Sequence, residues 1–249
     1  MGRDVAISVL LPPGYRLQLV RRFPVVLLND GQDFLALNLE RRLRLAFARG
    51  HVGPRIVVGI HADERRMREY GTSNQPNDRG LGDLANAYRI FIVDELMPFL
   101  RRMYRLRRHR EFWAIGGFSL GALSAFDIGY KHESSFADIG CFSASFWWRS
   151  TPFNPAAPDE NRIVIDRIRR SSRAADLRYF FMVGSDEETS DRNNNGIIDA
   201  VDDTLDVIAA LRDKGVSGGD ITYHFVEGGE HNQATWGPAL ITWMALLPV

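Results

Sequence analysis

The chain has 249 residues, 45% of them apolar, and its 31 basic and 31 acidic residues give a formal net charge of zero. A chain of this length and composition can bury one large core, so we expect a single domain over residues 1–249. Because the charges balance, no long-range field gathers a polyanion over the whole surface. We therefore expect a small-molecule partner and neither a nucleic-acid nor a membrane partner, while the composition specifies no oligomeric state.

Targeting and membrane signals are absent from the residue pattern. No stretch reaches the ~20 apolar residues that a membrane-spanning helix needs, and Met1 leads into polar residues rather than into a signal peptide. The one cysteine, Cys141, cannot form an internal disulfide and lies in an apolar run. We expect a soluble protein, which is cytoplasmic, or exported if a leader precedes residue 1.

Short apolar runs alternate with helical patterns along the whole chain, which predicts an α/β protein with a mostly parallel sheet and helices on both faces. Strands are expected at residues 5–11, 24–28, 55–60, 112–115, 137–142, 179–183 and 221–226. Ligands of open α/β sheets bind at the loops that leave the carboxyl ends of the strands. Catalytic residues are therefore expected on those loops.

A basic run follows the amphipathic helical pattern of residues 84–100. Its members are Arg101, Arg102, Arg105, Arg107, Arg108, His109 and Arg110. A nucleic-acid patch is one interpretation. Cations also collect at helix carboxyl termini, where they suit the helix dipole and stay solvated, and the pattern favours this second interpretation.

The nucleophile candidate is Ser119, in the pentapeptide Gly117-Phe118-Ser119-Leu120-Gly121 between a strand and a helix. A strand-to-helix turn this sharp needs small residues two positions either side of the serine, because larger side chains there would strike the strand or helix. The turn also places the serine beside helix N–H groups that stabilise an oxyanion. In this context the motif favours catalysis over an ordinary structural turn.

The base candidate is His231, in the loop that follows the last predicted strand. A serine triad in this kind of fold follows the order Ser, acid, His. His61 also follows a strand, but it precedes Ser119 in the chain. The alternative for His231 is a loop histidine that caps the final helix.

The acid is expected after the strand that ends at Val183. Asp186, Glu187 and Glu188 crowd this turn, and the residues alone leave the choice among them open. The acid has to be a buried acceptor that fixes the imidazole tautomer and stabilises the imidazolium.

Two backbone N–H groups are candidates for the oxyanion hole. One belongs to Leu120, the residue after the serine, and the other to Gln32, in the loop of residues 29–32 after an early strand. The alternative for the second loop is a common Asp-Gly turn without a catalytic role.

Residues 191–202 have the spacing of an EF-hand calcium loop. Glycine stands at the sixth position, and oxygen-bearing groups recur at the ligand positions: Asp191, Asn193, Asn195, the Ile197 carbonyl, Asp199 and Asp202. Asp202 replaces the usual final glutamate, as in dockerin loops. We expect a structural Ca²⁺ here and no organic cofactor, with a metal-free Asn- and Asp-rich turn as the alternative.

These motifs resemble the esterase family of α/β-hydrolases, which includes feruloyl esterases, enterochelin esterases, S-formylglutathione hydrolase and mycolyltransferases. The matching segments are residues 11–15, 28–32, 117–121 and 228–231, with Trp236 and the aromatic segment of residues 143–148. The resemblance implies the α/β-hydrolase fold and an acid about three residues after the strand-end glycine, which points to Glu187 and leaves Asp186 second. It also implies that the calcium-like loop is an insertion, and Ala122 departs from the glycine of many relatives.

The predicted function is hydrolysis of a carboxylic ester through an acyl-enzyme. The substrate is expected to be a small carbohydrate-linked, phenolic or siderophore ester. Acyl transfer to another alcohol uses the same residues and is the nearest alternative. A non-catalytic, calcium-dependent carbohydrate-binding protein is a second alternative, and the intact order of Ser, acid and His argues against it.

Overall fold

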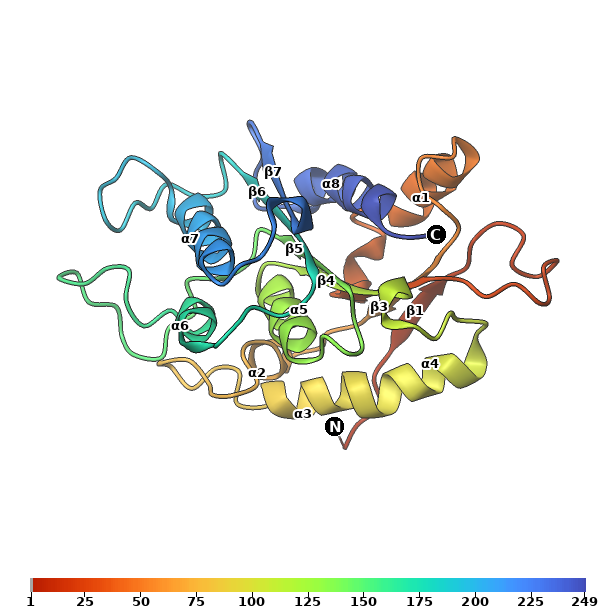
Figure 1. Cartoon of the computed structure of the whole chain (residues 1–249), viewed down its shortest axis with the longest axis horizontal. Coiled ribbons are helices and arrows are strands. Elements are labelled where there is room, and N and C mark those ends of the chain that lie inside the picture. Colours follow the sequence, from red (N-terminus) through yellow and green to blue (C-terminus); the bar gives the residue numbers. More distant parts are fainter. Residues whose placement is uncertain (1) are drawn as a thin grey trace.

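The computed structural model describes residues 2–249. Its centre is a seven-stranded sheet in the order β1-β3-β2-β4-β5-β6-β7 (Figure 1). The strands are β1 (Ile7–Leu10), β2 (Val25–Asn29), β3 (Ile56–Ile60), β4 (Trp113–Phe118), β5 (Asp138–Phe142), β6 (Arg178–Gly184) and β7 (Ile221–Val226). Only β1 runs antiparallel to its neighbour, so the predicted mostly parallel sheet is confirmed.

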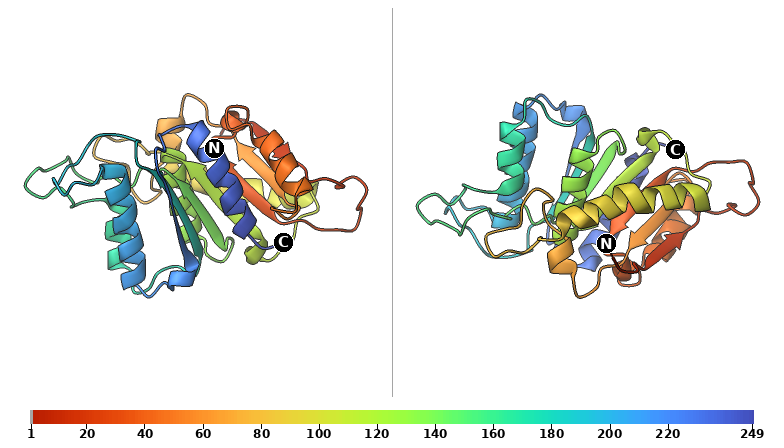
Figure 2. Two further views of the ribbon diagram at one scale, coloured as in Figure 1. Left: turned by 90° about the horizontal axis from the view of Figure 1, so that it is seen from above. Right: turned by 90° about the horizontal axis from the view of Figure 1, so that it is seen from below.

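Helices cover both faces of the sheet, as the alternating pattern predicts (Figure 2). On one face lie α1 (Leu39–Ala48) and α8 (Gln233–Leu246), which pack on Val26 and Leu28 of β2. The other face carries α3 (Ala85–Ile90), η2 (Phe91–Leu96), α4 (Met97–Met103), α5 (Leu120–Lys131), α6 (Ile163–Arg170) and α7 (Asp199–Asp213). Val25 and Leu27 point to that second face, because successive strand side chains alternate in direction.

The shorter elements are helices in the connections. They are η1 (Gly31–Phe34), α2 (Arg66–Glu69), η3 (Arg110–Phe112) and η4 (Gly218–Asp220). The helix predicted over residues 84–100 runs from α3 through the π-helical stretch η2 into α4, where Pro98 is one of the first two residues. Within residues 2–249, no helix has both the length and the apolar character to cross a membrane.

Two elements extend further than their sequence patterns indicate. β4 continues three residues past the predicted end and reaches Phe118. A Cβ atom on Gly116 would lie 2.9 Å from the Trp243 ring. Gly116 is therefore required for close packing within the strand and does not mark a turn. α7 begins at Asp199, inside the segment predicted to be a calcium-binding loop.

Candidate active site

Ser119 occupies the turn between β4 and α5, with φ 53° and ψ −122°. A non-glycine residue in this backbone region is strained, and such strain persists only where the surrounding structure imposes it. The Ser119 N–H donates to the Phe142 carbonyl at 2.9 Å, and its carbonyl accepts from the N–H groups of Ala122 and Leu123. The side chain is partly exposed at the carboxyl edge of the sheet, so the turn presents a fixed hydroxyl to solvent.

The glycines that flank Ser119 leave no room for side chains. A Cβ on Gly117 would lie 2.5 Å from the Gly121 carbonyl oxygen, and one on Gly121 would lie 2.4 Å from Asp30 Oδ2. Both distances are far below van der Waals contact. The steric requirement that the pentapeptide motif predicts is therefore met by specific backbone and carboxylate atoms.

The loop after β2 is tied to the start of α5. Asn29 Nδ2 donates to the Gly121 carbonyl at 2.7 Å, and Asn29 Oδ1 accepts from the Tyr88 hydroxyl at 2.6 Å. Asp30 is 2% exposed and accepts two bonds from the Arg66 guanidinium, at 2.7 and 2.9 Å. These contacts hold the 29–32 loop beside the Ser119 turn, since β2 and β4 are neighbours in the sheet.

The two predicted oxyanion donors lie on these adjacent strand ends. Leu120 is the first residue of α5, so its N–H is among those that lack a partner within the helix. Gln32 lies in η1, and its side chain donates to Asp30 Oδ1 at 3.0 Å and accepts from the Ala62 N–H at 2.9 Å. Both polar atoms of the Gln32 side-chain amide therefore have hydrogen-bond partners, and its backbone N–H remains the candidate oxyanion donor.

His231 lies in the loop after β7, where its Nδ1 is 3.0 Å from Glu187 Oε2. The Glu187 side chain is 1% exposed and that of His231 is 40% exposed. The other Glu187 oxygen, Oε1, accepts from the Gly184 N–H at 2.7 Å and from the Ser143 hydroxyl at 2.5 Å. A carboxylate with this many donors is held rigidly against one nitrogen of the imidazole.

The neighbouring carboxylates point elsewhere. Asp186 is exposed and accepts from the Ser185 hydroxyl at 2.7 Å, while Glu188 accepts from the Ala200 N–H at 2.7 Å. Within residues 2–249, Glu187 is the carboxylate that contacts His231. The same part of the structure has no direct hydrogen bond between Ser119 and His231, and the Ser119 hydroxyl lies 3.5 Å from the Ser145 hydroxyl.

Ser143 and Trp236 join the site in a way that sequence reasoning did not predict. The Ser143 hydroxyl donates to Glu187 and accepts from Trp236 Nε1 at 2.8 Å. The Trp236 ring also packs edge-on against His231, with centroids 5.1 Å apart. Ser143 follows β5 with φ 49°. The resemblance included both residues as matching positions, but their contacts join segments far apart in the chain.

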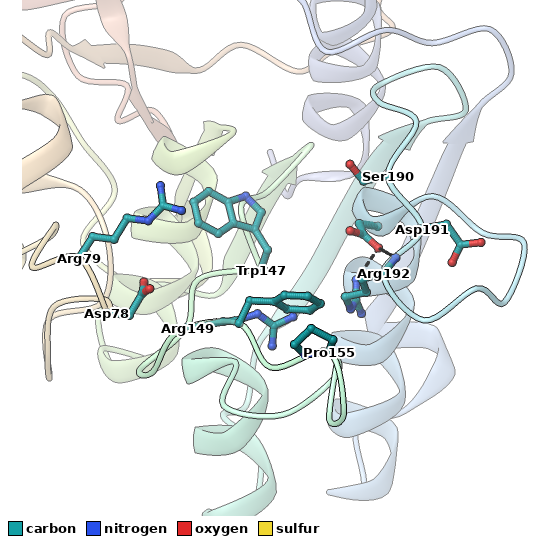
Figure 3. Close-up of a pocket in the computed structure, with 10 residues that line it drawn as sticks. Asp78, Arg79, Trp147, Arg149, Pro155, Ser190, Asp191 and Arg192 are labelled. Carbon is teal, nitrogen blue, oxygen red and sulfur yellow. Dashed lines mark hydrogen bonds and ion pairs between the residues drawn. The ribbon is translucent and has the colours of Figure 1, made fainter.

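A cavity of about 560 Å³ opens between three segments (Figure 3). It is lined by Asp78 and Arg79, by the 147–155 segment, and by residues of the 190–199 loop. Trp147 and Phe153 are each 48% exposed and supply aromatic surface. Trp147, which lines the cavity, lies two positions after Ser145, whose hydroxyl is 3.5 Å from the Ser119 hydroxyl.

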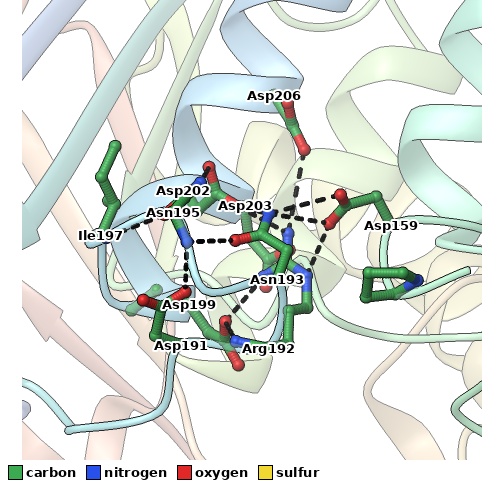
Figure 4. Close-up of polar contacts among 12 residues, drawn as sticks. Asp159, Asp191, Arg192, Asn193, Asn195, Ile197, Asp199, Asp202, Asp203 and Asp206 are labelled. Atoms are coloured by element: carbon green, nitrogen blue, oxygen red, sulfur yellow. Dashed lines mark hydrogen bonds and ion pairs between the residues drawn. The ribbon is translucent and has the colours of Figure 1, made fainter. Parts of the chain in front are cut away.

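The 191–202 loop forms the tight turn that its spacing predicts (Figure 4). The Asp191 carboxylate accepts from the N–H groups of Asn195 and Gly196 at 3.1 and 2.9 Å, and Asn195 Oδ1 accepts from the Ile197 N–H at 2.8 Å. Gly196 has φ 83°, the left-handed conformation that glycine adopts without strain. Asp202 accepts from the side-chain amide of Asn193 at 3.0 Å.

Arg192 is the feature of this loop that sequence reasoning missed. Its guanidinium is 5% exposed and lies 2.8 to 3.1 Å from carboxylate oxygens of several residues, namely Asp159, Asp199, Asp202 and Asp203. Asp159, Asp202 and Asp206 each bring an oxygen within 4.8 Å of the others, an acidic cluster that could hold a metal. Only Asp202 belongs to both this cluster and the predicted ligand set. Burial raises the pKa of Asp203 to about 6, although Arg192 and Arg162 oppose that shift.

The sheet order, the helices on both faces and the strained serine turn define an α/β-hydrolase. The chain belongs to the Putative esterase family, whose model matches residues 1–247, so it is an esterase and the resemblance is confirmed.

Individual relatives are distant. YbbA of Bacillus subtilis strain 168, an uncharacterized protein, is 23% identical over 230 residues, which cover 90% of this chain and 85% of YbbA. The structure of a ferulic acid esterase superposes with a TM-score of 0.71 at 18% identity, covering 97% of this chain and 91% of that one. Enterochelin esterase from Shigella flexneri gives a TM-score of 0.74 at 16% identity, covering 97% of this chain and 54% of that one. At these identities the structural likeness shows a shared fold.

Proposed function

We propose that the chain hydrolyses a carboxylic ester through an acyl-enzyme, with Ser119 as nucleophile, His231 as general base and Glu187 as the acid that orients the base. The observation that carries the proposal is the buried Glu187 carboxylate 3.0 Å from His231 Nδ1, at the same sheet edge as a serine held at φ 53°. A base held in one tautomer by a buried acceptor, and a nucleophile on a strained turn, are the parts that acyl transfer needs.

In the proposed reaction, Ser119 Oγ attacks the ester carbonyl carbon and its proton moves to His231 Nε2. The N–H groups of Leu120 and Gln32 hold the oxyanion that forms. The carbon–oxygen bond to the alcohol then breaks, and the alcohol takes the proton from His231. Water repeats the sequence on the acyl-enzyme and releases the acid. Throughout, the Nδ1–H group donates to Glu187, which stabilises the imidazolium without taking its proton.

The lining of the cavity supports an ester with a flat ring. Trp147 and Phe153 offer exposed aromatic faces, and Arg79 supplies a cation beside them. Such a surface suits a phenolic or sugar ring, which fits the name ferulic acid esterase of one structural neighbour. The 40% exposure of His231 lets water reach the base, which favours hydrolysis over transfer to another alcohol.

The direct test is an assay of the purified chain on p-nitrophenyl esters and on methyl ferulate. We expect steady release of p-nitrophenol, preceded by a burst for those esters whose acyl-enzyme is hydrolysed more slowly than it forms. Absence of turnover on every ester, from a folded preparation, would contradict the proposed function.

We also propose that the 191–202 loop binds one structural Ca²⁺ through Asp191, Asn193, Asn195, the Ile197 carbonyl and Asp202, with Asp199 bound directly or through water. Two features of the loop fit this ion: side-chain oxygens that cap the turn, and glycine at its left-handed position. The carboxylates in and around the loop also outnumber the guanidinium groups of Arg192 and Arg162 that pair with them. Chemistry at Ser119 involves no step through this ion.

Removing calcium with a chelator is expected to lower the melting temperature by roughly 5–10 °C, and added Ca²⁺ should restore it. The size follows from a ligand at about 100 times its Kd, which stabilises the folded state by about 2.7 kcal/mol, and from a shift of ~2–4 °C per kcal/mol. Calorimetry with and without Ca²⁺ measures it. Asp191→Asn should reduce the shift, whereas Asp213→Asn, at the exposed end of α7, should not. A melting temperature indifferent to millimolar calcium would show that the spacing match is accidental.

A further inference from the structure

Two segments of the chain carry many arginines and no carboxylates. Residues 11–23 contain Arg16, Arg21 and Arg22 without any Asp or Glu. Residues 96–110 contain six arginines and His109, again without any Asp or Glu. In a chain with zero net charge, such segments mean that positive charge is concentrated in one region and balanced elsewhere.

The fold places these two segments side by side. The Phe23 N–H donates to the Arg105 carbonyl at 2.8 Å, and the Arg107 N–H donates back to the Phe23 carbonyl at 2.9 Å. The Arg105 guanidinium lies 3.9 Å from the centre of the Tyr15 ring. Figure 1 shows the β1–β2 loop extending beyond the sheet near the end of α4, and Figure 2 shows it standing out from the body of the molecule. We call residues 11–23 and 96–110 together the basic face.

The arginines of the basic face are largely unneutralised. Arg21 and Arg22 donate to the Gln18 side chain and to the Leu106 carbonyl, and Arg101 lies over the Trp113 ring. Arg110 forms an ion pair with Asp176, and among residues 2–249 it is the arginine of the basic face that is paired with a carboxylate in this way. The face therefore presents positive charge that an anionic partner can approach.

Aliphatic side chains project from the middle of this charge. Leu17 is 86% exposed, Leu19 71% and Val20 94%, on a loop closed by turns such as the bond from the Leu17 N–H to the Gly14 carbonyl at 3.0 Å. Met103, at the end of α4, is 56% exposed. Grouped apolar side chains that a fold leaves in water mark interaction sites more often than chance exposure does.

We propose that the basic face docks on the surface of a bilayer that contains anionic phospholipid. Leu17, Leu19 and Val20 enter the interface between headgroups and acyl chains, and the surrounding arginines lie against the phosphates. A nucleic acid offers the arginines the same phosphates but no place for aliphatic side chains. A second copy of the chain would bring two positive faces together. The zero net charge led us to expect no membrane partner. The basic and acidic residues are, however, unevenly distributed over the surface, and the cluster of arginines is the reason that we now infer a membrane partner.

The catalytic edge stays free in this arrangement. The β1–β2 loop and the connection from α4 to β4 lie at the amino ends of the parallel strands, whereas Ser119 follows the carboxyl end of β4. Docking would hold the enzyme at the bilayer with its candidate active site facing away from the lipid. The inference does not depend on the proposed triad.

Sedimentation of the whole chain with vesicles tests the proposal. We expect binding to vesicles of phosphatidylcholine mixed with phosphatidylglycerol, weak binding to phosphatidylcholine alone, and release by high salt, which screens surface charges. The triple variant Leu17→Ser, Leu19→Ser, Val20→Ser should lower the partition coefficient roughly 10-fold or more, because it removes the apolar part of the interaction.

Matched controls exist elsewhere on the surface. Leu35→Ser removes a side chain that is 91% exposed near η1, and Arg169→Gln with Arg170→Gln removes two exposed cations from α6. Neither should change vesicle binding, and unchanged ester hydrolysis by the triple variant would show that it is folded. Failure to bind anionic vesicles, or equal binding by the triple variant, would overturn the proposal. Dimer formation that the triple substitution abolishes, or duplex DNA binding in place of vesicle binding, would overturn it as well.

Discussion

Replacing Ser119 or His231 by alanine is expected to lower kcat for a p-nitrophenyl ester on the order of 10³-fold or more. Triad residues act as a unit, so the loss of either one removes most of the covalent pathway. The residual rate should come from the oxyanion donors of Leu120 and Gln32, which neither substitution removes. Stopped-flow or steady-state release of p-nitrophenol measures both variants.

A matched histidine makes this result specific. His61 also follows a strand, and its Nε2 lies 2.7 Å from the Ser8 hydroxyl. His61→Ala should therefore retain most of the activity. Turnover like that of the wild type from purified, folded Ser119→Ala would reject the nucleophile assignment. If His61→Ala lost activity and His231→Ala retained it, the base would have to be reassigned.

Glu187→Gln is expected to lower kcat on the order of 10²-fold or more, while Asp186→Asn should stay close to the wild type. An amide in place of the carboxylate can hold the imidazole in the wrong tautomer and cannot stabilise its charge. Asp186 is exposed and bonds to Ser185, so its amide variant loses little. The two substitutions are isosteric and adjacent, which makes each a control for the other.

Melting temperatures of both acid variants separate catalysis from folding. Glu187 accepts bonds from Gly184 and Ser143, so some loss of stability accompanies Glu187→Gln. A kcat that falls while the protein remains folded at the assay temperature supports the assignment. A larger loss of kcat for Asp186→Asn than for Glu187→Gln would reverse the choice of acid and leave the rest of the mechanism standing.

The sheet was predictable because its strands are locally encoded. Each buried strand is a short apolar run bounded by polar or turn residues, and Val25 to Leu28 show this clearly. The end of β4 was harder to place, because Gly116 and Gly117 are turn signals in sequence but serve close packing against Trp243 and Gly121. The start of α7 was missed because Asp199 and Asp202 read as loop ligands although they also open a helix.

Candidate site residues could be predicted from the sequence where a short contiguous motif indicates them, and could not be predicted where they depend on contacts between distant segments. Ser119 stands in a contiguous motif and His231 in the loop after the last strand, and both remain predictions with respect to their roles. The choice among three adjacent carboxylates depends on which side chain turns inward, and residue types do not encode that. The contacts of Ser143 with Glu187 and of Arg192 with Asp159 join residues 44 and 33 positions apart, so no local pattern indicates them.

The basic run of residues 101–110 shows a second way in which sequence analysis falls short, because it treats one segment at a time. Sequence alone favoured a solvated helix terminus for Arg101 to Arg110, which explains one segment by itself. The pairing of Phe23 with the 105–107 segment brings Arg21, Arg22 and three exposed aliphatic residues to the same place. The combination of positive charge and exposed aliphatic side chains arises only when folding brings these two distant segments together, so neither segment alone predicts it.

The most direct test of the proposed mechanism is covalent labelling of the nucleophile, read by mass spectrometry. Incubation of the purified chain with a fluorophosphonate should add one phosphonyl group per molecule, abolish ester hydrolysis, and place the adduct on the peptide that contains Ser119. Ser119 is the group expected to react, because the proposed base His231 and the oxyanion donors of Leu120 and Gln32 act on its hydroxyl. Ser8, whose hydroxyl lies 2.7 Å from His61 Nε2, is the serine whose labelling would most directly compete with this assignment. An adduct on a different residue, or full hydrolytic activity after complete labelling of Ser119, would contradict the assignment of this esterase as a Ser119 acyl-enzyme hydrolase.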